Sequence, residues 1–157
     1  MKNFVIAACF ILLAQAAGLI GAYFTFDAIP AWYVFLNKPF FSPPNWIFGP
    51  VWTILYTLMG IAAFLVFKKG WKKKPVREAI YFFGFQLALN SLWSIIFFGF
   101  RSPLWALVEI VILWIAIAFT ISRFARVNKT AALLLIPYIL WVTFALILNL
   151  AIVLLNN

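Results

Sequence analysis

Long apolar stretches, separated by short polar ones, make up most of the chain. Each stretch is long enough to cross a hydrocarbon layer of about 30 Å as a helix, because a helix rises about 1.5 Å per residue. We therefore expect five transmembrane helices, at residues 4–26, 45–67, 76–100, 104–124 and 130–155. Little chain remains outside them. The pattern predicts an all-α membrane protein, a single five-helix bundle that forms one domain over residues 1–157.

Residues 27–44, between the first two helices, are the least hydrophobic part of the outer side. Four prolines prevent a continuous helix there: Pro30, Pro39, Pro43 and Pro44. The segment is also too aromatic for a solvated linker, with Trp32, Tyr33, Phe40 and Phe41. Long loops without regular structure are uncommon and often functional. We predict a lid over the outer end of the bundle; an aromatic belt at the membrane surface is the alternative.

Composition agrees with a membrane protein, since 68% of the residues are hydrophobic and only 10% are charged. Soluble domains are about half apolar and about a quarter charged. The net charge of +9 would suggest a nucleic-acid partner in a soluble protein. Here the cations are segregated, because the predicted outer side receives only Lys38 and Arg101. The predicted inner side receives Lys2, Lys68, Lys69, Lys72, Lys73, Lys74, Arg77, Arg123, Arg126 and Lys129.

This asymmetry predicts a cytoplasmic N-terminus and a C-terminus outside, because loops on the cytoplasmic side of membrane proteins are rich in Lys and Arg. Charges that anchor helices also explain the basic composition, so we expect no nucleic-acid partner. The chain has no histidine and one cysteine, Cys9. A disulfide within the chain is excluded, and so are the commonest metal ligand and the usual haem ligand. We expect no metal site, no resident cofactor and no classical acid–base catalysis.

Polar groups inside the hydrocarbon layer are costly and tend to mark function or bonding between helices. Three of the predicted helices carry polar and aromatic residues at helical spacing, which places each set on one face. The sets are Trp52 and Tyr56; Gln86, Asn90, Trp93 and Phe97; and Trp141, Ala145 and Asn149. Their depths, taken from the helical rise, are similar and lie mostly in the outer half.

The three faces are therefore expected to meet below the lid, where the small side chain of Ala145 leaves room for a flat ligand. Aromatic walls with a few amides suit a large, planar, mostly apolar ligand rather than an inorganic ion. The alternative is that the amides bond between helices and the tryptophans fill the core. The shared depth and the lid favour a pocket for the set as a whole.

Glu109 is the only acidic residue well inside a predicted span. A proton relay is one interpretation, and a bond near the outer interface, to Arg101, is the one we favour. Asp27 and Glu78 lie at predicted helix ends, and we expect them to be solvated.

Small residues recur on two predicted helices. Ala14, Gly18 and Ala22 recur every fourth position in the first helix, which predicts close helix packing. Gly84 and Ala88 form a similar small pair in the third helix and are a candidate dimer contact.

Three stretches carry a family resemblance: WYVFLNKPFFSPPNWIFGPVWTILY (32–56), QLALNSLWSIIFF (86–98) and PYILWVTFALILN (137–149). In this order, and with this five-segment layout, the whole chain resembles the TspO/MBR family, also called translocator protein or peripheral benzodiazepine receptor. The resemblance implies a five-helix membrane fold, commonly a homodimer, with a pocket under the first loop. It also implies binding of porphyrins and other tetrapyrroles, of isoquinoline and benzodiazepine-type drugs and of membrane lipid; animal members bind cholesterol.

The family's motifs carry over to residues of this chain. The implied lid residues are Trp32, Tyr33 and Pro44. The implied wall residues are Trp52, Asn90, Trp141 and Ala145. The full set of predicted ligand-binding residues adds Phe48, Tyr56, Gln86, Trp93, Leu148 and Asn149. Light-dependent porphyrin breakdown, described in the family, would use Trp52 and Trp141 as one-electron partners of the excited ring.

One feature departs from the animal members, whose last helix ends in a cholesterol-recognition pattern with a Tyr and then a basic residue. This chain has neither after Asn149. The absence of this pattern weakens the argument that the protein binds a sterol. It favours a bacterial plasma membrane.

The leading hypothesis is a membrane receptor for tetrapyrroles that acts in tetrapyrrole homeostasis and stress response. The alternative is a transporter of tetrapyrroles, lipids or sterols. The common transporter folds show internal repeats and helices broken at the membrane midplane, and neither is evident in the sequence. A third hypothesis is a bundle with a purely structural or partner-binding role.

Overall fold

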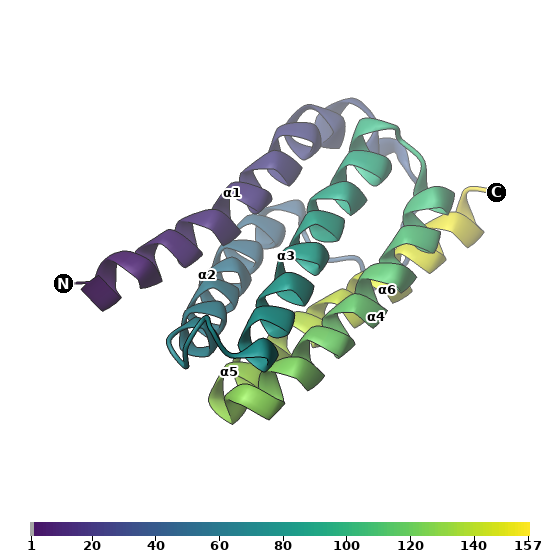
Figure 1. Ribbon diagram of the computed structural model, residues 1–157. Coiled ribbons are helices and arrows are strands. Elements are labelled where there is room, and N and C mark those ends of the chain that lie inside the picture. Colours follow the sequence, from purple (N-terminus) through teal and green to yellow (C-terminus); the bar gives the residue numbers. More distant parts are fainter. Residues whose placement is uncertain (1) are drawn as a thin grey trace.

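The computed structural model describes residues 2–157, in which all the regular secondary structure is helical and there are no strands (Figure 1). Five stretches within it are long and apolar enough to cross a membrane: Lys2–Ala31, Asn45–Phe67, Lys74–Gly99, Pro103–Val127 and Lys129–Leu155. The helices are α1 (Lys2–Ala31), α2 (Phe48–Phe67), α3 (Lys74–Ser94), α4 (Pro103–Val127), α5 (Lys129–Leu134) and α6 (Ile136–Leu155). Shorter turns are η1 (Tyr33–Phe35), η2 (Asn45–Ile47) and the π-helical η3 (Ile95–Gly99). The predicted all-α bundle of five spans is confirmed.

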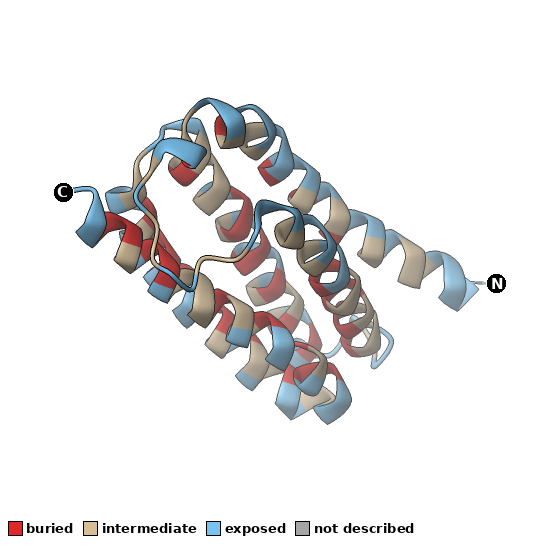
Figure 2. Cartoon of the chain, turned by 180° about the vertical axis from the view of Figure 1, so that it is seen from behind, coloured by how far each residue is buried: buried red, intermediate tan, exposed pale blue. Residues whose placement is uncertain are grey.

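The helices pack as a ring around a common interior. α1 lies against α2 and α3, and α4 lies against α3 and α6. α2 contacts α5 well but meets α6 at few positions, so the ring is loosest between α2 and α6. Buried residues face inward along the helices, and exposed ones face outward (Figure 2). We call the end of the bundle with residues 32–47 and the C-terminus the outer end.

The first helix is longer than predicted. It continues to Ala31, so residues 27–31 are helical and the predicted lid of residues 27–44 begins only at Trp32. Pro30 lies in the last turn, where its missing N–H removes a single helical hydrogen bond. The next turn still forms, with the Trp32 N–H donating to the Ala28 carbonyl at 3.0 Å. A proline therefore ends this helix without shortening it to the predicted boundary.

The last span consists of two helices that meet at Leu135. Asn128 caps the first of them, because its side-chain oxygen accepts the Ala131 N–H at 3.1 Å. Pro137 lies in the first turn of α6, where a proline costs little because the N–H groups there have no helical acceptor. The break thus falls at the inner end of the span and leaves α6 regular beside the other helices.

Close packing joins α1 and α2 in the inner half of the bundle. A Cβ added to Gly60 would lie 2.5 Å from the Ile11 Cα, so only glycine allows this approach. Ala14 is fully buried, as its place in the small-residue pattern predicts. Gly18 lies directly against the Tyr56 ring. Ala22 is exposed, so the predicted packing does not extend to it.

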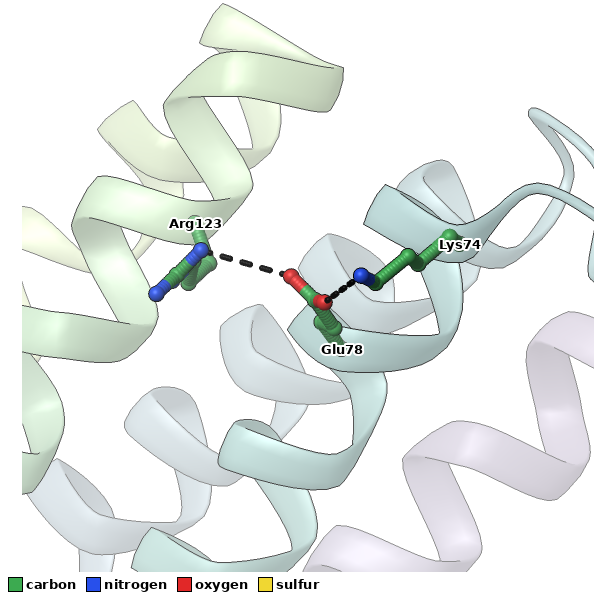
Figure 3. Close-up of polar contacts among 3 residues, drawn as sticks. All are labelled: Lys74, Glu78 and Arg123. Atoms are coloured by element: carbon green, nitrogen blue, oxygen red, sulfur yellow. Dashed lines mark hydrogen bonds and ion pairs between the residues drawn. The ribbon is translucent and has the colours of Figure 1, made fainter.

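Glu78 does not stand free in solvent as predicted, because two cations surround it (Figure 3). Its carboxylate accepts a hydrogen bond from Arg123 of α4 at 3.3 Å, and the Lys74 ammonium lies 3.8 Å away. The pairs join α3 to α4 at the inner end. Ion pairs this exposed are typically worth less than about 1 kcal/mol, so they orient the helices more than they stabilise them.

Glu109 is only 5% exposed, and within residues 2–157 no protein group donates to either carboxylate oxygen. The predicted bond to Arg101 is wrong. Glu109 shares the buried face of α4 with Ala106, Ile110 and Leu113, whereas Arg101 is exposed in the turn before that helix. A helical face is set by spacing along the chain. This spacing places Glu109 on the buried face of α4, whereas Arg101 stays exposed in the turn.

Replacing Glu109 with Met is expected to raise the unfolding temperature, because burying a carboxyl group without a partner costs free energy that an apolar chain of similar length avoids. The gain should be about 1–3 kcal/mol in the free energy of unfolding. Glu109→Gln is the matched control, since it keeps a buried polar group and should gain less. Thermal unfolding in detergent micelles measures both. A less stable Met variant would show that the carboxyl group makes a stabilising interaction.

Candidate ligand-binding cavity

A cavity of about 240 Å³ lies in the outer half of the bundle. Its walls come from α1, α2, α6 and the end of α3 with η3, and Tyr33 of η1 lies over it. Most of the predicted site residues line it: Tyr33, Phe48, Trp52, Tyr56, Trp93, Trp141, Ala145, Leu148 and Asn149. Seven residues that helical spacing grouped on three predicted helices thus border one space: Trp52, Tyr56, Trp93, Phe97, Trp141, Ala145 and Asn149.

Four of the predicted site residues do not line the cavity. Trp32 packs at the edge of the Phe97 ring, with 5.7 Å between ring centroids, and Pro44 is exposed on the loop. Gln86 and Asn90 are buried behind the cavity wall. The side chains that line the cavity therefore separate Gln86 and Asn90 from any ligand in this space.

Gln86 and Asn90 belong to a chain of buried hydrogen bonds across α2, α3 and α6. The Tyr56 hydroxyl donates to the Asn90 side-chain oxygen. The Asn90 amide donates to the Tyr138 hydroxyl at 3.0 Å, and that hydroxyl donates to the Gln86 oxygen at 2.7 Å. For these two amides, bonding between helices is the correct interpretation. They act on the cavity indirectly, by fixing Tyr56.

Tyr56 in turn positions the aromatic wall. Trp52 stacks on its ring, with 5.4 Å between centroids and 28° between planes, and meets the edge of Tyr138 at 6.2 Å. Across the sparse contact between α2 and α6, Phe48 lies 6.2 Å from Trp141 in an edge-on arrangement. These rings offer flat apolar surface, which suits an aromatic ligand.

Asn149 lines the cavity, but its amide is already engaged. It donates to the Pro103 carbonyl at 2.8 Å and accepts from the Trp93 indole at 3.2 Å. The bonds tie α6 to the start of α4 and to α3. Asn149 therefore fixes Trp93 in the wall, and its main contribution to the site is shape.

The lid, residues 32–47, is anchored to the bundle by aromatic contacts. Tyr33 is buried against Phe97 and Phe98, with centroids 6.2 and 5.7 Å apart. Burial raises the pKa of the Tyr33 phenol, so this hydroxyl group stays neutral to a higher pH than that of a free tyrosine. The Lys38 ammonium donates to the carbonyls of Tyr33 and Leu36, both at 3.0 Å, and so closes the η1 turn.

A second attachment joins the lid to the C-terminal end of α6. The Asn37 N–H donates to the Asn156 side-chain oxygen at 3.0 Å, and the Asn156 amide donates to the Asn37 carbonyl at 2.9 Å. Figure 2 shows the segment between α1 and α2 crossing the end of the bundle beside the C-terminus. We call this pair of hydrogen bonds the latch.

Asn156→Ala is expected to loosen the lid, because it removes both latch bonds at once. Net values of about 0.5–1.5 kcal/mol per hydrogen bond predict an opening equilibrium larger by roughly tenfold. Amide hydrogen exchange over residues 33–44 measures it. Asn157→Ala is the control, since the neighbouring Asn157 makes no hydrogen bond to the lid. Equal exchange in the two variants would contradict a latch.

Residues of α1 that form one whole wall were not predicted as site residues. They include Gly18, Leu19, Gly21 and Ala22. A Cβ added at Gly18 would lie 2.3 Å from the Tyr56 ring, so this glycine makes room for that ring. The recurrence of small residues was the available signal. It predicted contact between helices but could not show that part of the stripe borders an empty space.

The site provides stacking surfaces and few free polar groups. Across residues 2–157, no three His, Cys, Asp or Glu side chains come together in a way that could hold a metal ion. The Trp141 indole N–H has no hydrogen-bond partner within the described chain. The arrangement can bind a flat apolar molecule, and it lacks the paired titratable groups of classical acid–base catalysis.

Comparison with known proteins agrees with this architecture. The profile of the TspO/MBR family matches residues 10–155. "Tryptophan-rich protein TspO" of Chlorobaculum tepidum is 48% identical over 155 residues, which cover 99% of this chain and 98% of that protein. "Tryptophan-rich protein TspO" of Archaeoglobus fulgidus is 46% identical, covering 93% and 94%. The human "Translocator protein" is 41% identical, covering 87% and 82%. The chain is an integral membrane protein that belongs to the TspO/MBR family.

Proposed function

We propose that this protein is a membrane receptor for tetrapyrroles such as protoporphyrin IX, and that it acts in tetrapyrrole homeostasis and stress response. The observation that carries the proposal is the cavity with flat aromatic walls, Trp52 and Trp141 among them, and the small Ala145 between larger residues. A planar macrocycle can stack on such walls. Isoquinoline and benzodiazepine-type drugs, which are also flat and aromatic, suit the same surfaces.

The site should accept a metal-free ring, since the chain has no histidine to act as an axial ligand. The cavity volume of about 240 Å³ is below the range of about 300–1,000 Å³ usual for ligand pockets. A tetrapyrrole therefore requires the walls to move. The lid is the part we expect to move, because the aromatic contacts of Tyr33, the hydrogen bonds of Lys38 and the latch hold it in place, rather than a packed helix.

Titration of protoporphyrin IX into the protein in lipid nanodiscs tests the proposal. Stacking beside the tryptophans is expected to quench their fluorescence, with saturation at one ligand per chain. Empty nanodiscs with free tryptophan give the control for absorption of light by the porphyrin. Quenching that does not saturate would overturn the proposal and favour a purely structural bundle. Uptake of porphyrin into sealed vesicles that carry the protein, above that of protein-free vesicles, would favour the transporter.

We also propose that the bound porphyrin is broken down in light and oxygen, with Trp52 and Trp141 as one-electron partners of the excited ring. Both indoles border the cavity. Trp52→Phe and Trp141→Phe should slow the loss of porphyrin absorbance under illumination. Trp93→Phe is a matched control, because Trp93 also borders the cavity but its indole N–H is bonded to Asn149. Unchanged loss in the first two variants would remove their role.

For location, we propose a bacterial plasma membrane with the N-terminus in the cytoplasm and the C-terminus outside, from the segregation of Lys and Arg to one side. We further propose a homodimer that uses the lipid-facing side of α3. Gly84 and Ala88 are both exposed there, and a Cβ added at Gly84 would meet nothing within 4 Å. Small residues of this kind allow two helices to approach closely.

A further inference from the structure

One side of the cavity reaches the side surface of the bundle, between two helices. Among the residues that line the cavity, the exposed ones are Leu19 and Ala22 of α1 and Gly49 and Thr53 of α2. The lining residues from α3, η3, α6 and the lid are buried or half-buried. The space therefore continues outward between α1 and α2. We call this opening, bordered by these four residues, the slot.

The local sequence explains why the slot is confined to the outer half. Toward the inner end, the two helices are held together where Gly60 meets Ile11. The Gln15 amide then donates to the Thr53 carbonyl and the Thr57 hydroxyl, each at 3.0 Å, and so bridges the two helices. Beyond this bridge, two of the four residues that border the slot, Ala22 and Gly49, have little or no side chain. A Cβ added at Gly49 would meet nothing within 4 Å, so no neighbouring group fills the opening there.

The surroundings of the slot indicate that it opens to lipid. Its outer surface is flanked by the apolar side chains of Leu19, 70% exposed, Tyr23, 77% exposed, and Ile54, 61% exposed. Ala22 lies about 14 Å below the outer end of α1, at a rise of about 1.5 Å per residue. This depth is inside a hydrocarbon layer of about 30 Å. A ligand in the slot would thus meet acyl chains rather than water.

We infer that ligands pass into the cavity sideways from the membrane, through the slot between α1 and α2. The inference rests on the proposed ligand-binding function and adds the class of ligand selected: flat molecules that first dissolve in the bilayer. A porphyrin with two carboxylates can lie in the membrane with its ring among the acyl chains. A porphyrin with a carboxylate on every edge is held in water by its charge, so it does not reach the slot.

Gly49→Phe tests the inference by placing a ring in the open space at the slot. The protein is held in nanodiscs, protoporphyrin IX is delivered from donor vesicles, and tryptophan quenching is followed in time. A plug in a passage raises the barrier in both directions, so the association and dissociation rates should both fall by about tenfold. The equilibrium dissociation constant should change much less than either rate.

Ala125→Phe is the matched control. It places a phenyl ring at an exposed position of α4, away from the cavity and from the proposed dimer contact. Its rates should equal those of the unaltered protein. Ala22→Phe, on the α1 border of the slot, is the second test variant. It keeps the test decisive if Gly49→Phe does not fold.

The possible results separate the slot from the proposed function. Unchanged rates in Gly49→Phe and Ala22→Phe, with intact affinity, overturn the slot and leave the binding proposal standing. A weaker affinity with an unchanged association rate means that the new ring fills the cavity, and this also counts against the slot. Absence of saturable binding to the unaltered protein overturns the proposed function and the slot together.

Discussion

Ala145→Phe is expected to weaken protoporphyrin IX binding by at least about 100-fold, a loss of about 2.7 kcal/mol. Ala145 lines the cavity, one helical turn from both Trp141 and Asn149 on α6. A phenyl ring at this position would occupy much of a space that measures only about 240 Å³. The ligand and the ring would compete for the same volume, and packed walls give way only at a cost. The fluorescence titration described above measures the change.

Two further variants make this prediction specific. Ala145→Val adds less volume and should give an intermediate loss. Ala125→Phe makes the same chemical change at an exposed position of α4, away from the cavity, and should leave the affinity unaltered. Unaltered affinity in Ala145→Phe would place the ligand outside this cavity and overturn the proposed site.

Asn90→Ala is expected to lower the free energy of unfolding by about 2 kcal/mol. The substitution removes the acceptor for the Tyr56 hydroxyl and the donor to the Tyr138 hydroxyl. A buried hydroxyl group left without its partner keeps the cost of its desolvation. Unfolding in mixed detergent micelles measures the change. Ligand affinity should also fall, since a looser Tyr56 no longer fixes the Trp52 ring stacked on it.

A double-mutant cycle with Tyr56→Phe tests the physical reason. Once the Tyr56 hydroxyl is gone, Asn90→Ala should cost less, with a coupling of about 0.5–1 kcal/mol. Gln86 remains as acceptor for Tyr138 in every variant, so this part of the chain of bonds is constant. If the losses in free energy of unfolding of the two single variants add up to that of the double variant, Asn90 does not act through Tyr56.

Much of the fold could be predicted because the membrane imposes strict conditions. Backbone groups in lipid must be bonded within their own segment, so five long apolar stretches have to be helices. The start of the second span at Asn45 and the end of the last at Leu155 agree with prediction. The first helix was predicted too short because proline was taken as a stop. The effect of a proline on a helix depends on where in the last turn the proline lies.

The candidate site could be predicted in part, and the errors share a cause. Helical spacing correctly grouped Trp93 with Gln86 and Asn90, but the residues of one face meet different neighbours at different depths. Trp93 reaches the cavity, whereas the two amides meet Tyr138 first. For Glu109 the same spacing determined the buried face, and proximity in sequence to Arg101 did not bring the two together.

The sequence by itself determined that the chain spans the membrane five times and that aromatic and amide residues lie in the outer half of the bundle. Hydropathy and helical period are local properties, so no partner had to be known. Only the tertiary structure decided which groups face an empty space, that α1 supplies one wall, and that Asn156 holds the lid. Those features depend on what stands opposite each residue. That is set by how five helices pack, which no single stretch of sequence contains.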